Sequence, residues 1–144
     1  MDDLRGAGST RRARLAAGAA AVLTLAAGLG VRAVATGDPA KYAGDALYTV
    51  LLCALVVLAA PRLRPVTAAG VALAASWAVE FSQLSGIPAD LSRRSTAARL
   101  VLGSTFNPPG LFWYAIGAAL AYAVHAALVR RGWRQRQWRT ATAG

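Results

Sequence analysis

Four long apolar segments constrain the fold of this chain more than any other feature. They cover residues 15–35, 42–60, 66–84 and 109–129, and each is close to the roughly 20 apolar residues that cross a bilayer core. Hydrophobic residues make up 56% of the 144 residues and charged residues only 15%, which is too apolar for an ordinary soluble domain. Because backbone groups in lipid must be paired internally, the sequence predicts an all-α fold, a polytopic membrane four-helix bundle.

The basic residues predict the orientation of these segments. With both termini in the cytoplasm, eleven basic residues lie inside the cell: Arg5, Arg11, Arg12, Arg14, Arg62, Arg64, Arg130, Arg131, Arg134, Arg136 and Arg139. Five lie outside: Arg32, Lys41, Arg93, Arg94 and Arg99. Cytoplasmic loops carry the excess of Lys and Arg, so residues 1–14 and 130–144 are interpreted as basic cytoplasmic tails that flank a four-span domain at residues 15–129.

Charge distribution also bears on partners and on cellular location. The net charge of +10 is gathered at the ends of apolar segments, which indicates contact with membrane lipids and argues against nucleic acid. Arginine far outnumbers lysine and alanine is abundant, a bias typical of GC-rich bacterial genes. We therefore expect a multi-pass protein of the bacterial cytoplasmic (inner) membrane, either alone or as a homodimer or part of a larger membrane complex.

The first apolar segment has an alternative interpretation. Basic residues at 11, 12 and 14 precede it, and Ala33-Val34-Ala35 resembles a signal-peptidase site. Its apolar run is longer than a usual signal core, and Arg32 lies close to the supposed cleavage point. We favour a retained span over a cleaved signal.

Cofactor chemistry finds little support in the sequence. Cys53 is the one cysteine and His125 the one histidine, each within an apolar segment. One cysteine allows no internal disulfide, and neither residue has neighbouring metal ligands in the sequence. We predict packing roles for both, with no metal and no cofactor.

Glu80 is the most unusual residue of the apolar segments. It lies in VALAASWAVEFSQL, where the surrounding residues carry no charge, and a carboxylate at mid-span costs roughly 2.5–3.5 kcal/mol on insertion scales. Gln83, three residues later, shares its helix face. We expect Glu80 to contact a polar partner from the outer end of the bundle: Arg94, Arg99 or a tyrosine.

The predicted orientation brings the other unusual polar residues to the same end. The second span begins at the outer surface, so Asp45 and Tyr48 lie near that surface. Tyr114 lies one turn into the fourth span, which also begins outside, and residues 85–108 form an outer loop. The predicted binding site comprises Asp45, Tyr48, Glu80, Gln83, Arg94, Arg99 and Tyr114. Structural alternatives stay open: Asp45 could cap its helix in the first turn, the arginines could anchor at headgroups, and the tyrosines could belong to an aromatic belt.

Small residues predict where the helices approach closely. Tyr114, Gly117 and Ala121 form a stripe on the fourth span, and Ala26 and Gly30 have the same spacing on the first.

The chain resembles a family of small bacterial membrane proteins known as domain of unknown function 2809. The similar stretches are KYAGDALY from Lys41, EFSQL from Glu80, RST from Arg94, RLVLGSTF from Arg99 and YAIG from Tyr114. The family is in turn distantly similar to VanZ-like proteins, which share a buried Glu-x-x-Gln type motif. The resemblance implies a fold and a membrane location but no reaction.

One position departs from that family pattern. The family usually has an aspartate four residues after the phenylalanine that is Phe106 here, and this chain has Gly110. The resemblance therefore implies a less acidic site, in which Asn107 partly replaces the missing polarity.

Three functions fit these observations. The first is a binding or accessory protein of the cell envelope, whose outer polar site holds an anionic lipid, a lipid-linked envelope precursor or an amphiphilic drug. The second is an intramembrane enzyme with Glu80 as general base, although the sequence contains no Ser-His arrangement, HExxH or P-loop and its catalytic residues are unknown. The third is a small transporter or an accessory subunit of a membrane complex. We favour binding over catalysis.

Overall fold

The computed structural model describes residues 2–141, with the side chains of residues 2–6, 136, 139 and 140 left out. The ends of the two predicted tails, and the side chains of Arg5, Arg136 and Arg139, therefore lie outside the described residues. The chain forms α1 (Asp2–Val34), α2 (Asp38–Ala59), α3 (Pro65–Ser82), a 3-10 turn η1 (Gln83–Ser85), α4 (Ile87–Arg94), α5 (Thr96–Leu102) and α6 (Pro108–Ala141). The all-helical prediction is confirmed for the described residues.

Three of these helices are long and apolar enough to cross a membrane: residues 7–34 of α1, all of α2, and residues 108–135 of α6. They are the helices of a membrane protein, as predicted. The third predicted span corresponds to α3, which has 18 residues and falls outside this set. Proline stands in the first turn of both α2 and α3, and α6 begins at Pro108, where a missing backbone N–H costs nothing.

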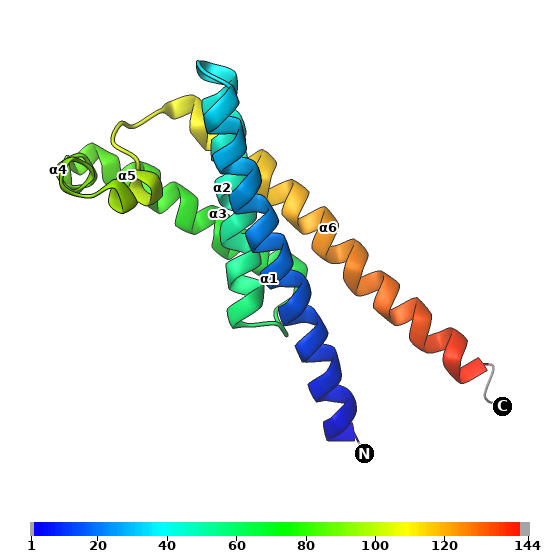
Figure 1. The fold of residues 1–144 in the computed structure, drawn as a ribbon. Helices are drawn as coiled ribbons and strands as arrows, with labels where there is room; N and C mark the ends of the chain where they lie inside the picture. Colours follow the sequence, from blue (N-terminus) through cyan, green and yellow to red (C-terminus); the bar gives the residue numbers. More distant parts are fainter. Residues whose placement is uncertain (1, 142–144) are drawn as a thin grey trace.

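Helix α2 is the centre of the fold, because it contacts α1, α3 and α6. Tyr42 of α2 lies beside Trp113 of α6, and Cys53 shares the core with Ala121 further along, so α2 and α6 run parallel. Helix α3 is antiparallel to both. Thr49 contacts Ser76 while Asp45, earlier in α2, interacts with Glu80, later in α3, and Trp77 contacts Leu111 while Ala69 shares the core with Ala121. In Figure 1, α1 lies along α2, whereas α3 and α6 diverge from each other away from their crossing. The helices are therefore arranged around α2, with α1 on its outside.

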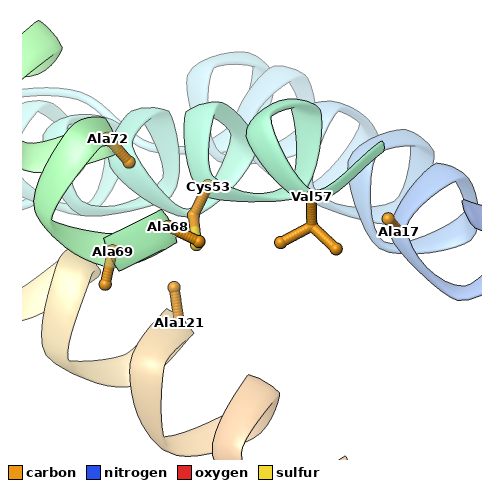
Figure 2. Close-up of a cluster of buried hydrophobic side chains, with 7 residues drawn as sticks. All are labelled: Ala17, Cys53, Val57, Ala68, Ala69, Ala72 and Ala121. Carbon is orange, nitrogen blue, oxygen red and sulfur yellow. The ribbon is translucent and has the colours of Figure 1, made fainter. Parts of the chain in front are cut away.

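Small side chains make up most of the buried core. It comprises Ala17, Cys53, Val57, Ala68, Ala69, Ala72 and Ala121 (Figure 2). Four helices contribute to this cluster, and alanine at most of its positions lets their backbones approach closely. The packing role predicted for Cys53 agrees with its 3% exposure.

The closest approach is between α2 and α6, at Gly117. A Cβ atom at this position would overlap the carbonyl oxygen of Ala46, so only glycine fits. Ala121, one turn later, is buried in the core. The small-residue stripe predicted on the fourth span is confirmed.

The first span packs against α2, but not through the residues whose spacing suggested a stripe. Ala26 and Gly30 are exposed, and nothing lies within 4 Å of a Cβ built at Gly30. Helix α1 instead buries Ala17 and Ala21. In an alanine- and glycine-rich helix, small residues occur on every face, so their spacing alone could not select the contacting one.

The predicted outer loop is mostly helical. Residues 85–108 contain α4 and α5, and α5 begins where the Ser95 side chain accepts a hydrogen bond from the Ala98 backbone N–H, an N-cap that the sequence analysis missed. In Figure 1, α4 and α5 lie beyond the end of α3, on the side away from α6.

Candidate functional site

The site is built around Glu80, in the last turn of α3, which is only 2% exposed. Its Oε2 atom accepts a hydrogen bond from the Tyr114 hydroxyl at 2.9 Å. Its Oε1 atom accepts another from the backbone N–H of Asn107, just before α6. The predicted polar partner is thus a tyrosine, and the carboxylate joins α3 to the start of α6.

A hydroxyl pair joins α3 to α2, one turn before Glu80 in α3. Thr49 and Ser76 are fully buried, with 2.8 Å between their oxygens. Ser76 donates to the carbonyl of Ala72 at 2.9 Å, so its hydrogen is used and Thr49 must donate to Ser76. Both side chains therefore have partners inside the protein.

Asp45 lies one turn before Thr49, and its surroundings differ. It is close enough to Glu80 and Tyr114 to interact electrostatically with both, and its Oδ2 atom is buried with no hydrogen-bond partner among the described residues. The capping interpretation was wrong, because α2 begins at Asp38 and Asp45 is two turns into it. A membrane-buried carboxylate with an unpaired oxygen is a candidate ligand contact.

Glu80, Tyr114 and Asp45 line one cavity of about 660 Å³, which lies between α1, α2, the end of α3, the start of α6, and α5 with the segment after it. Six of the seven predicted site residues border it: Asp45, Tyr48, Glu80, Gln83, Arg99 and Tyr114. Apolar side chains such as Leu25 and Leu100 form other parts of its wall. Carboxylates, phenols, an amide and a guanidinium thus meet beside apolar surface, a composition suited to an amphiphile.

Arg94, the seventh predicted residue, does not border the cavity. Its side chain is 75% exposed and pairs with Asp90 at 3.1 Å, while Arg93 pairs with the other oxygen of Asp90 at 3.2 Å. Helix α4 places all three residues at i, i+3 and i+4 spacing. Because residues 85–108 were predicted to form a loop, the helical spacing that pairs Asp90 with the two arginines was not predicted.

Gln83 holds the end of α5 by a hydrogen bond and also lines the cavity. Its Nε2 donates to the carbonyl of Leu102 at 2.7 Å, where α5 ends. Ser92 donates to the next carbonyl, that of Gly103, at 2.7 Å. These bonds tie the end of α5 to η1 and α4, while the Oε1 atom of Gln83 is buried without a partner among the described residues.

Gly110 lies directly beside Asp45. A Cβ built at Gly110 would be 3.0 Å from Asp45 Oδ2 and 3.3 Å from Asn107 Nδ2, and that amide nitrogen is also buried and unpartnered in the described part of the chain. The Asn107 side chain therefore occupies the surroundings of Gly110, although it comes a turn earlier in the sequence. Any side chain at position 110 would therefore contact Asp45 through its first carbon atom.

Two basic residues of the cavity were not among the predicted site residues. Arg32, near the end of α1, and Lys41, in the first turns of α2, both border it and both act electrostatically on Asp45. Lys41 lies four residues before Asp45, so helical spacing could have identified it. Arg32 could not be found this way, because its position depends on how α1 packs against α2.

His125 is one of the residue types that could bind a metal ion, together with Cys, Asp and Glu. His125 Nδ1 is buried without a hydrogen-bond partner in the described chain. Across those residues, His, Cys, Asp and Glu form no group of three that could hold a metal ion.

Comparison with known proteins gives one match. A family described as "Protein of unknown function (DUF2809)" matches residues 37–118, more than half of the chain, and this range includes all six cavity-lining site residues. Searches of curated proteins and of solved structures found no match.

Proposed function

Because the chain belongs to the DUF2809 family of proteins of unknown function, we propose its function from the site itself: an integral membrane protein that binds the polar headgroup of an amphiphile near the outer leaflet. The single observation that carries this proposal is the convergence of six polar side chains on one cavity that also has apolar walls. A soluble polar ligand would not need those walls, and a hydrocarbon would not need the charges.

The charges favour an anionic or zwitterionic headgroup. Arg32, Lys41 and Arg99 border the cavity along with Asp45 and Glu80, so three positive groups face two negative ones. Guanidinium groups bind phosphate and carboxylate well. Tyr48 and Asp45 also border the cavity and would contact the polar or cationic part of the same headgroup.

The proposal includes four membrane crossings with both termini in the cytoplasm of a bacterium. Helices α2 and α6 run parallel, so the chain between them has to return from one side of the membrane to the other, and α3 is the helix that makes this return. With η1 it spans 21 residues, about 30 Å at 1.5 Å per residue. The start of α1 and the last turns of α6 lie at the same end of the molecule in Figure 1.

Reporter fusions test this topology. Reporters that are active only outside the cytoplasm should be active after Gly37 and after Arg94, and inactive after Arg64 and after Gly144. Activity after Gly144 would reverse the orientation and remove the site from the outer leaflet.

Photocrosslinking tests the binding function. A photoreactive residue at Leu100, which borders the cavity, is compared with one at Leu55; their exposures of 47% and 44% are nearly equal. We expect position 100 to capture an amphiphile from native membranes and position 55 to give only bulk-lipid background. Equal labelling at both positions would refute the binding proposal.

Charge variants sharpen this experiment. Arg99→Gln removes a charge-assisted contact and should lower specific labelling about tenfold. Gly110→Asp adds a carboxylate beside Asp45 and should also lower it, whereas Arg94→Gln, outside the cavity, should not.

A second function is favoured by one observation, namely that two carboxylates and the Tyr114 hydroxyl meet at the cavity. Such a group could transfer protons in an intramembrane reaction on the bound amphiphile. Mass spectrometry of captured material distinguishes the two functions. A catalytic protein should convert it, and Glu80→Gln should abolish conversion while leaving capture intact.

A further inference from the structure

A second cavity lies at the opposite end of the α1–α2 pair. It also measures about 660 Å³ and is bordered by one face of α1, by Leu58 near the end of α2 and by Arg62 in the turn that follows. Its floor is apolar, formed by Leu15, Gly18, Ala19 and Leu58, and its rim carries Arg11, Arg14 and Arg62. It shares no residue with the site described above.

The three arginines have no acidic partner in the described part of the chain. The ion pairs found there are those of Asp90 with Arg93 and Arg94, on the far side of the molecule. Three guanidinium groups around one cavity repel each other, and a bound anion would offset this repulsion. Basic pockets between membrane helices bind anionic lipid headgroups.

Spacing along the helix places this cavity at a membrane interface. Arg14 and Arg32 are eighteen residues apart on α1, about 27 Å at 1.5 Å per residue, which is close to the thickness of the hydrocarbon core. If Arg32 is at one headgroup layer, Arg14 is at the other. The apolar floor then lies just inside the bilayer, where an acyl chain begins.

We propose that this second cavity binds one anionic phospholipid, with its phosphate on Arg11, Arg14 and Arg62 and the start of an acyl chain on the floor around Gly18 and Leu58. Gly18 is what leaves room for the chain, because a Cβ built there would meet only the Leu58 side chain, at 4.0 Å. The lipid would join α1 to α2 at the end where α1 and the turn after α2 carry positive charge.

Native mass spectrometry of the full-length protein tests this proposal, with phosphatidylglycerol titrated against phosphatidylcholine. We expect one saturable phosphatidylglycerol adduct, weakened about tenfold or more in the triple variant Arg11→Gln, Arg14→Gln, Arg62→Gln, since each basic residue contributes measurably. The matched control, Arg130→Gln, Arg131→Gln, Arg134→Gln, removes the same charge from α6 and should leave this adduct unchanged. Equal weakening in the control would show a general surface attraction and overturn the proposal.

The variant Gly18→Leu tests the apolar floor of the cavity independently of its arginines. It keeps every arginine and fills the floor, so the adduct should be lost although the net charge is unchanged; Gly132→Leu in α6, where nothing lies within 4 Å, is its control. Retention of the adduct in Gly18→Leu would refute the pocket. Millimolar inorganic phosphate should not displace the lipid, and displacement would identify a free-phosphate site instead. Circular dichroism confirms that each variant is folded.

Discussion

Thr49 and Ser76 form one polar contact between α2 and α3. One turn away on the same two helices, Asp45 and Glu80 meet Tyr114 of α6 at a second one, in which Tyr114 donates a hydrogen bond to Glu80. The first is closed: both hydroxyls are fully buried and have partners within the protein. The second is open, because Asp45 keeps an unpaired oxygen and both carboxylates border a cavity. The comparison teaches that burial of a polar residue in an apolar helix does not by itself make it a candidate for function; an unpaired polar atom in a residue that borders a cavity does.

The largest expected effect comes from forcing α2 and α6 apart, because these two helices approach most closely at Gly117. Gly117→Val places a branched side chain against the Ala46 carbonyl, and overpacking of this kind should destabilise the protein by about 3 kcal/mol. Denaturation in detergent measures the loss. Gly132→Val on the same helix has open space around it and should change stability little; a similar loss there would mean that Gly117 is not a special contact.

Tyr114→Phe acts on the open contact alone. It removes the hydroxyl donor to Glu80 and leaves one oxygen of a buried carboxylate unpaired, which should destabilise the protein by about 2 kcal/mol. The control is Tyr48→Phe, since Tyr48 borders the same cavity and packs against Tyr114 at 6.2 Å between ring centroids. If the double variant Tyr114→Phe, Glu80→Gln regains stability, the loss arises from the unpaired charge; a further loss would contradict this account.

Thr49→Val acts on the closed contact alone. It removes one hydroxyl, while Ser76 keeps its bond to the Ala72 carbonyl. Hydrogen bonds between membrane helices average about 0.6 kcal/mol, and we expect a loss of that size with capture at position 100 unchanged. A loss of crosslinking in this variant would show that the two contacts are not independent.

Arg94→Gln should have the smallest effect. Its ion pair with Asp90 is exposed, and such pairs contribute about 0–1 kcal/mol. Both stability and capture should stay near the values of the unaltered protein. Weakened capture would mean that Arg94 reaches the ligand despite lying outside the cavity in this structure.

The sequence predicted the helices well because apolar length is a strong signal. It also predicted six of the residues at the cavity, since charge bias and helical spacing are enough to bring Asp45, Glu80 and Tyr114 to one end. It failed at Arg94 and at Ala26, where the outcome depends on local helix formation in residues 87–94 and on which face of α1 meets α2. Such choices are made by packing between helices, which spacing within one helix does not determine. Whether the six residues bind a ligand stays a prediction.

The partnership between Glu80 and Tyr114 also has a consequence for biosynthesis. Helices α1 and α2 contact each other and can pair as soon as both have been made, but Tyr114 comes 34 residues after Glu80. At about 5–20 residues per second, the ribosome needs roughly 2–7 s to cover that distance. Until Asn107 has been made, 27 residues after Glu80, the carboxylate has neither partner, and until Tyr114 has been made one of its oxygens stays unpaired. If α3 crosses the membrane as proposed, its insertion is completed by the arrival of α6, and truncated chains that end before Tyr114 should leave α3 incompletely inserted.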